Sequence, residues 1–286
     1  MPLVAPPVTA VHCPNQRVEI GGRQLAYRSI GTGKPIVLCP RFRGNMDTWD
    51  PAFLDALAQN GFQAITFDCS GTGLSTGTRE FGPVAMARDA ADLMQALHLE
   101  EVVIAGWSLG GMAAQVVLAM YPDRISHAVL IGSTPPGPAP KTSQQLFYDT
   151  ARLPEYSLEH ETILFFDPSS ASSRAAAALS RERIAQRVHG RSDLVDAAWS
   201  NASLGSKPSI PPFPANDVLE VLKTTNVPIL HVGGDHDIAC PVANWYALNQ
   251  VLPTLHLLTF PRTGHGPQHQ HPSSVARYIS AFVRLA

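Results

Sequence analysis

The residues best placed to do chemistry lie around a serine at position 108. Ser108 stands in the pattern Gly-Trp-Ser-Leu-Gly, with Gly106 and Gly110 two positions to either side. A short apolar run of strand length, 102–107, precedes it, and an Ala-, Met- and Leu-rich run of helix length, 112–120, follows. A serine at so sharp a strand-to-helix turn needs small neighbours, because its own backbone is strained. We therefore expect a nucleophilic serine at the N-terminus of a helix, whose dipole favours negative charge.

A neutral serine is a weak nucleophile, so this hydroxyl needs a base, and the base needs an acid that fixes its tautomer. Of the 11 histidines, His265 differs in its placement. Gly264 and Gly266 flank it, in the loop after the last predicted strand. Two aspartates, Asp235 and Asp237, compete for the acid in the loop after the preceding strand. The residues alone leave the choice between these two acids open.

Four other histidines are not expected to take part in catalysis. His231 and His256 fall within predicted strands, and we expect a core position for His231. His269 and His271 lie in a polar loop, for which we expect exposure to solvent. No carboxylate or cysteine accompanies this histidine-rich run, so no metal site is predicted. The four cysteines are scattered without a CxxC pair, which indicates reduced thiols rather than disulfides.

Strands and helices alternate along most of the chain. The expected strands are 17–20, 24–30, 35–39, 62–68, 102–107, 125–132, 228–233 and 255–260. The helices expected between and after them include 50–60, 84–97, 216–224, 241–252 and 273–285. This alternation predicts an α/β fold with a mostly parallel, doubly wound sheet of about eight strands.

The alternation stops after the sixth strand. Two proline-rich stretches, 133–140 and 208–214, enclose a block with helical patterns and no convincing strand. We predict a core domain of residues 1–134 and 215–286, with residues 135–214 inserted as a helical cap. Sites in open α/β sheets form at the carboxyl ends of strands, where this insertion leaves, so we expect the cap to cover the nucleophile. The helices expected in the cap are 142–153, 157–166, 171–188 and 193–204.

Taken together, the serine turn, the element order and the two late loops resemble the α/β-hydrolase fold family, from about residue 17 to the C-terminus. In that family the acid commonly stands in Gly-x-x-Asp, four residues before a proline that opens the next helix. Gly234 and Pro241 stand at those positions relative to Asp237. The resemblance therefore implies a catalytic set of Ser108, Asp237 and His265.

The family resemblance also points to an oxyanion hole. The loop Pro40–Gly44 stands where many relatives have His-Gly-x-x-Gly, and it departs clearly from that pattern. The functional part of the loop is a backbone N–H, so the resemblance implies that the N–H groups of Phe42 and Leu109 bind the oxyanion. Asp68–Ser75 resembles the Asp-x-x-Gly-x-Gly-x-Ser loop that braces the site. There Ser70 replaces the usual arginine, so the local ion pair must be absent or made otherwise.

Large side chains of the cap and of the loops beside the serine are candidates for the substrate pocket. Arg41 could reach a substrate carboxylate, or it could serve a structural role. The pocket candidates are Arg41, Trp107, Phe147, Phe165 and Phe166.

The resemblance implies a serine hydrolase that cleaves an ester-like bond, in a carboxylic ester or a lactone, through an acyl-enzyme. Its substrate is expected to be small and largely apolar. The enzyme is expected to need no cofactor and no metal. A serine at this turn argues against haloalkane dehalogenases and epoxide hydrolases, which place an aspartate there. The alternative is cofactor-free haloperoxidase, perhydrolase or oxygenase-type chemistry with the same residues. A non-catalytic ligand-binding protein on this fold is a third possibility.

Composition and charge limit the partners. The chain has 286 residues, of which 45% are hydrophobic and 15% charged, enough for one α/β domain with an insertion. A net charge of −2 without a basic stripe argues against a nucleic-acid partner. No signal peptide or membrane-spanning run is expected. We therefore predict a cytoplasmic protein that acts on a small molecule; the sequence does not indicate its oligomeric state.

Overall fold

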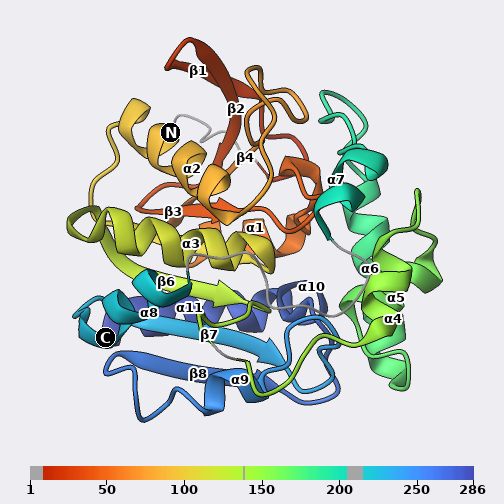
Figure 1. The fold of residues 1–286 in the computed structure, drawn as a ribbon. Helices are drawn as coiled ribbons and strands as arrows, with labels where there is room; N and C mark the ends of the chain where they lie inside the picture. Colours follow the sequence, from red (N-terminus) through yellow and green to blue (C-terminus); the bar gives the residue numbers. More distant parts are fainter. Residues whose placement is uncertain (1–8, 138, 205–214) are drawn as a thin grey trace, which may run out of the picture.

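The computed structural model describes residues 9–137, 139–204 and 215–286, and its centre is one eight-stranded sheet. The strand order is β1-β2-β4-β3-β5-β6-β7-β8 (Figure 1). The strands are β1 (Gln16–Ile20), β2 (Arg23–Ile30), β3 (Lys34–Cys39), β4 (Phe62–Phe67), β5 (Val102–Trp107), β6 (Ile125–Ile131), β7 (Ile229–Gly234) and β8 (Leu255–Phe260).

The direction of the strands decides where a site can form. β2 runs antiparallel to both β1 and β4, whereas every pairing from β4 through β8 is parallel. The carboxyl ends of β3 and of β5 to β8 therefore meet at one edge of the sheet. This confirms the predicted fold, a mostly parallel sheet of eight strands.

Helices cover both faces of the sheet, as its sequence pattern requires. Successive residues of a strand point to opposite faces. In β3, Ile36 and Leu38 join one hydrophobic cluster, while Val37 and Cys39 join the other. The first cluster is covered by α1 (Pro51–Gln59) and α11 (Pro272–Leu285), and the second by α2 (Pro83–Ala96), α3 (Leu109–Met120) and α8 (Ala215–Thr224). Both faces of the sheet are therefore buried from solvent, which accounts for the continuous apolar runs in the central strands.

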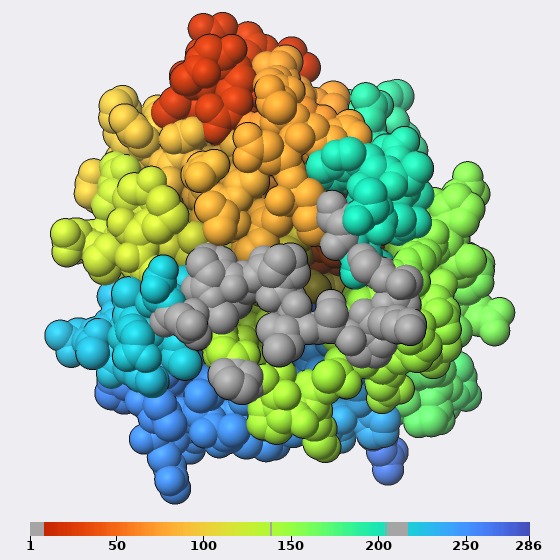
Figure 2. Space-filling model, in the orientation of Figure 1, coloured from red at the N-terminus to blue at the C-terminus, as the bar shows by residue number. Residues whose placement is uncertain are grey.

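Between β6 and α8 the described residues contain helices and no strand. Together these helices form one side of the molecule, beside the carboxyl-end edge of the sheet (Figure 1), and they form the green-to-teal surface in Figure 2. The expected proline-rich stretch 208–214 lies outside the described residues. The helices are α4 (Gln145–Ala151), α5 (Leu158–Phe165), α6 (Ala171–Ala185) and α7 (Ala197–Leu204).

The helix expected over 241–252 is much shorter, because α9 spans only Ala243–Tyr246. Its surroundings are held by backbone bonds between residues three apart, such as Trp245 N to Val242 O at 3.0 Å, which mark tight turns rather than a full helix. The buried Trp245 donates through Nε1 to the carbonyl of Ser133 at 2.6 Å. Tertiary contacts of this segment with the start of the insertion therefore override the helical pattern.

The histidine-rich loop also differs from expectation. Residues 267–270 form a short helix, α10 (Pro267–Gln270), that the sequence analysis did not predict. It turns His269 inward, so the expected exposure of this residue is wrong. The imidazole packs on Trp107 with ring centroids 4.6 Å apart, and its Nδ1 lies 3.2 Å from the hydroxyl of Ser180 in α6.

His231 lies in the core, and its burial couples stability to pH. Its ring stacks on Trp245 at 4.8 Å between centroids, and desolvation lowers its pKa to about 3. An unfolded histidine titrates near pH 6.5. Between these two values the unfolded chain binds the extra proton. Stability is therefore lost as the pH falls, by about 1.4 kcal/mol per pH unit for one such group.

We expect His231→Phe to flatten the fall in Tm between pH 7 and pH 4, because phenylalanine cannot take up a proton on unfolding. The flattening should be partial, since burial also lowers the pKa of His269, to about 4. Thermal unfolding followed across this pH range measures the slope, with the exposed His256→Phe as the matched control. Equal slopes in the wild type and in His231→Phe would contradict the prediction.

Candidate active site

Ser108 occupies a strained turn between β5 and α3. Its backbone has φ 59° and ψ −118°, a region that residues other than glycine rarely adopt. A Cβ added to Gly106 would strike the carbonyl of Gly110, and a Cβ added to Gly110 would strike the carbonyl of Cys39. The small residues of the motif are thus required by close backbone approach, and the serine stands at the N-terminus of α3 as expected.

His265 and Asp237 form a buried pair. His265 Nδ1 lies 2.8 Å from Asp237 Oδ2, and the two side chains are only 2% and 1% exposed. The other carboxylate oxygen, Oδ1, accepts the N–H groups of Ala239 at 2.8 Å and Cys240 at 2.7 Å. Asp235, by contrast, has a side chain 40% exposed. The structure therefore brings Asp237, and not Asp235, to the histidine.

The loop that carries His265 is fixed from several sides. Trp107 donates from Nε1 to the carbonyl oxygen of His265 at 2.7 Å. The N–H of Gly266 donates to the carbonyl of Phe165, at the end of α5, at 2.7 Å. At Gly132, where φ is 47°, an added Cβ would lie 2.5 Å from the carbonyl oxygen of His265. Contacts from the ends of β5 and α5 therefore set the position of the imidazole together.

Ser108 and His265 line the same small cavity, of about 10 Å³, to which Phe147 also contributes. Among the described residues, no hydrogen bond joins the hydroxyl of this serine to the imidazole. Such bonds are often long in unliganded enzymes and tighten when substrate binds. The arrangement nevertheless brings the hydroxyl of Ser108 to the cavity that is also lined by His265, the histidine paired with Asp237.

The two N–H groups expected at an oxyanion hole are available. In the described ranges neither Phe42 N nor Leu109 N donates to a protein acceptor. Arginines hold the loop that lacks the His-Gly pair. Arg41 Nη1 donates to the carbonyl of Phe42 at 2.7 Å, and Arg43 donates to the carbonyls of Leu153 and Pro154, each at 2.7 Å. Hydrogen bonds from Arg41 and Arg43 thus hold the loop in place of the usual His-Gly pair.

The side chain of Arg41 packs against aromatic rings. Its guanidinium carbon lies 4.6 Å from the ring centroid of Phe165 and 5.3 Å from that of Trp107. Desolvation lowers its pKa to about 10. Its side chain also lines the small cavity that Ser108 and His265 share.

Ser70 stands where relatives have an arginine, and Arg23 makes the local ion pair instead. Arg23 Nη2 lies 2.9 Å from Asp89 Oδ1 and also pairs with Asp92. Ser70 Oγ donates to the same Oδ1 of Asp89 at 2.6 Å. The neighbouring Asp68 is fully buried and accepts the N–H groups of Met46 and Leu74, so its role is structural.

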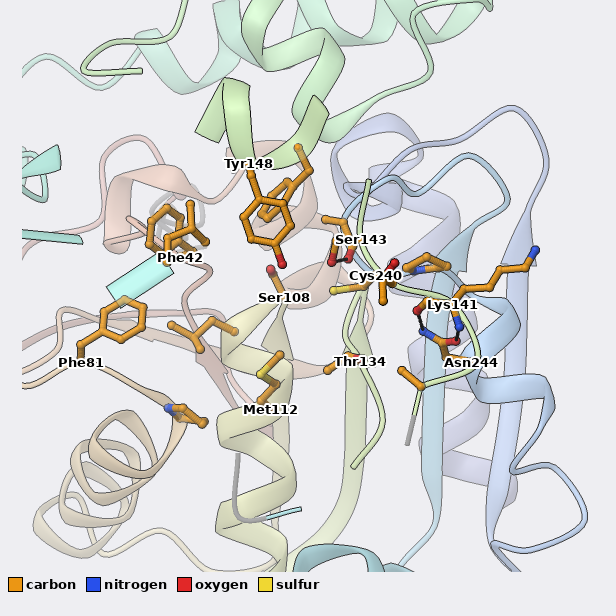
Figure 3. A pocket seen from close by; sticks show the side chains of 18 residues that line it. Phe42, Phe81, Ser108, Met112, Thr134, Lys141, Ser143, Tyr148, Cys240 and Asn244 are labelled. Carbon is orange, nitrogen blue, oxygen red and sulfur yellow. Dashed lines mark hydrogen bonds between the residues drawn. The ribbon is translucent and has the colours of Figure 1, made fainter. Parts of the chain in front are cut away.

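A larger cavity of about 140 Å³ opens beside Ser108 (Figure 3). Its lining is mostly apolar, with polar groups of Ser143, Lys141 and Asn244 toward one end. Its apolar and aromatic lining includes Phe42, Phe81, Leu109, Met112, Phe147 and Tyr148.

The five pocket candidates fall in different places. Phe147 lines both cavities beside Ser108, whereas Arg41 and Phe165 line the smaller of these two and also a third cavity. Trp107 and Phe166 are buried and, of the three, line only this third cavity, of about 460 Å³, whose lining does not include Ser108.

The sequence analysis missed Tyr148, Met112 and Cys240, which line the larger cavity. Met112 follows the serine by four positions on α3, so helical spacing could have indicated it. Nothing local in the sequence singles out the other two.

Two further findings concern metals and membranes. No group of three or more His, Cys, Asp or Glu side chains in the described part of the chain is placed to hold a metal ion. None of the described helices is long and apolar enough to cross a membrane.

Comparison with known proteins agrees with this geometry. The profile of the alpha/beta hydrolase fold family matches residues 34–272. A non-heme haloperoxidase of Rhodococcus erythropolis is 27% identical over 277 residues, which cover 92% of this chain and 96% of the relative. A pimeloyl-[acyl-carrier protein] methyl ester esterase of Nitrosomonas europaea is 26% identical over 275 residues, covering 91% and 99%.

Solved structures give the same answer. An alpha/beta hydrolase fold protein from Chitinophaga pinensis is similar at a TM-score of 0.81 and 26% identity, over 97% of this chain and 100% of that one. The chain belongs to the alpha/beta hydrolase fold family. It is an enzyme, a hydrolase, and the non-catalytic alternative is therefore set aside.

Proposed function

We propose that this enzyme is a serine esterase in which Ser108 is the nucleophile, His265 the general base and Asp237 the acid that orients it. The observation that carries the proposal is the convergence of a strained serine with a buried 2.8 Å imidazole–carboxylate pair. The Nδ1 bond to the carboxylate leaves Nε2 of the imidazole as the nitrogen that takes a proton.

The proposed reaction follows from these positions. His265 takes the proton of Ser108 as the hydroxyl oxygen attacks the ester carbonyl carbon. The oxyanion rests on the N–H groups of Phe42 and Leu109. The alkoxy C–O bond then breaks, its electron pair stays on the leaving oxygen, and the imidazolium returns the proton to that oxygen. Water, activated by the same imidazole, releases the acid from the acyl-enzyme.

The substrate we propose is a small, largely apolar ester or lactone. The cavity beside Ser108, of about 140 Å³ with a mostly apolar lining, supports a small acyl or alcohol group. We also propose that residues 135–214 act as a cap on a core of residues 1–134 and 215–286. Phe147 and Tyr148 of α4 reach into that cavity, which supports this division.

A p-nitrophenyl ester series with acyl chains of increasing length tests the function. Turnover should be present and should be abolished when a fluorophosphonate, which reacts with activated serines, has labelled the enzyme. Peptide mapping should find the label on Ser108. Absence of turnover across the series, or a label on another serine, would remove the proposal.

A second candidate is cofactor-free perhydrolysis, which the haloperoxidase relative favours. Here hydrogen peroxide replaces water in attacking the acyl-enzyme, and the product is a peracid that oxidises halide in solution. Bromination of a dye that requires peroxide, halide, a carboxylic acid and Ser108 together would establish it. Ester hydrolysis without such bromination would leave the esterase reaction alone.

We expect Phe147→Ala to change the chain-length preference, because this ring fills part of the cavity wall beside Ser108. Burying apolar area is worth about 25 cal/mol per Å², so removal of the ring should favour longer acyl groups. The ratio of kcat/KM between long and short esters should shift by roughly 10- to 200-fold.

The control for this variant is its neighbour, Leu146→Ala, whose side chain is 48% exposed. It should keep the wild-type preference. A Phe147→Ala enzyme with a lower Tm and an unchanged preference would show that the ring serves packing only.

A further inference from the structure

Tyr148 of α4 stands over the candidate nucleophile. Its side chain is buried, with the residue 5% exposed, and it lines the same cavity as Ser108. Figure 3 shows the phenol extending from α4 with its oxygen directed toward the hydroxyl of Ser108. The aromatic ring packs edge-on against Phe147, with centroids 5.2 Å apart, which fixes its direction.

The hydroxyl of Tyr148 has no hydrogen-bond partner among the residues that the structure describes. The buried phenol of Tyr27 does have one, and so does the half-buried phenol of Tyr156. Tyr156 donates to the carbonyl of Ala151 at 2.6 Å, and Tyr27 donates to Gln16 at 2.8 Å. Buried tyrosine hydroxyls usually find a partner. The Tyr148 hydroxyl opens into the cavity that Ser108 lines, so it is free to donate to an acceptor that arrives with the substrate.

The acceptor can be identified from the tetrahedral intermediate of the proposed esterase reaction. Once bonded to Ser108 Oγ, the reacting carbon carries three other groups: the oxyanion, the alkoxy oxygen and the acyl chain. Two of them accept hydrogen bonds, and the core N–H groups of Phe42 and Leu109 are placed for the oxyanion. The alkoxy oxygen is then the acceptor left for a donor from the cap side.

We propose that Tyr148 is a catalytic residue that donates a hydrogen bond to the leaving-group oxygen. This inference rests on the proposed esterase function. As the C–O bond breaks, its electron pair moves to the alkoxy oxygen, which takes a proton from His265. Tyr148 keeps its own proton and only stabilises the charge that develops, since His265 supplies the proton that the leaving oxygen takes.

The size of this effect depends on the leaving group. An alkoxide is a strong base, so a hydrogen bond to its oxygen strengthens greatly as charge develops. A p-nitrophenolate spreads its charge over the ring and needs little such help. Loss of the donor should therefore slow alkyl esters by roughly 10- to 100-fold, the range of one hydrogen bond to a developing charge.

Tyr148→Phe tests the proposal with two acetates, ethyl acetate and p-nitrophenyl acetate. The value to compare is kcat/KM, because it covers the steps up to departure of the alcohol. We expect a loss of about 10- to 100-fold on ethyl acetate and of less than about 3-fold on p-nitrophenyl acetate. Tm should stay unchanged, since phenylalanine keeps the ring and its packing.

The control removes a phenol elsewhere. Tyr246 is exposed, with its hydroxyl 3.0 Å from that of Thr259, and Tyr246→Phe should leave both rates unchanged. Equal losses on the two acetates would place Tyr148 at the oxyanion, and no loss on either would make it a packing residue. Both outcomes overturn the inference while Ser108-dependent hydrolysis remains. If the wild type shows no Ser108-dependent turnover of either acetate, the esterase proposal itself fails.

Discussion

Replacing Ser108 by alanine should lower kcat for ester hydrolysis by about 10³-fold or more. Without the hydroxyl no acyl-enzyme forms, and only the oxyanion donors and substrate binding remain. The fold should survive, because the side chain is small and its hydroxyl has no protein partner among the described residues. Steady-state kinetics on a p-nitrophenyl ester, with Tm measured in parallel, checks both expectations.

Ser126→Ala is the matched control for this variant. Its hydroxyl donates to the carbonyl of Glu101 at 2.9 Å, at the amino end of β6, whereas Ser108 follows the carboxyl end of β5. The control should keep the wild-type kcat. An Ser108→Ala enzyme with a kcat within a few-fold of wild type would remove the serine from its proposed role.

The parts of the site that could be predicted from sequence are those that local geometry dictates. Gly106 and Gly110 predict a turn in which backbone segments pack closely. In the structure both glycines lie against backbone carbonyl groups. The apolar runs of β3 and β5 identify strands buried on both faces. The motif predicts the turn at Gly106 because the carbonyl that its Cβ would strike belongs to Gly110, only four residues further along the chain.

Long-range contacts account for what the sequence analysis missed. Arg23, far from Ser70 in the chain, supplies the ion pair whose usual arginine is absent. His269 is buried because Trp107 and Ser180, from other elements, receive its ring. The sequence marks none of these partners, since each contact depends on how separate elements pack.

The side of the site formed by α4 and α5 was the least predictable. Phe147 and Tyr148 are neighbours on α4, yet only the first was a pocket candidate, because a helical run of large side chains does not reveal which face meets the core. The hydrogen bond from Gly266 N to the carbonyl of Phe165 likewise joins the histidine loop to α5 through backbone atoms alone. Backbone-to-backbone contacts of this kind leave little trace in residue identity.

Asp237→Asn should lower kcat by roughly 10²- to 10⁴-fold, because the amide cannot hold the imidazole in its working tautomer. The Ala239 and Cys240 N–H groups donate to Oδ1, so they select the amide oxygen for that position. The amide nitrogen then faces His265 Nδ1 and donates to it. A proton therefore moves to Nε2, the nitrogen that must accept the proton of Ser108.

Asp235→Asn is the control that makes this result specific, since it changes the same group two residues away. Asp235 contacts His236 at 2.7 Å and the N–H of Thr263 at 3.2 Å, on the exposed side of the loop. We expect this variant to keep kcat within a few-fold of wild type, with both proteins folded by thermal unfolding. If instead Asp235→Asn is the inactive variant, the acid has been misassigned. If both remain active, the imidazole works without a carboxylate partner, and the buried 2.8 Å pair serves only to hold the loop.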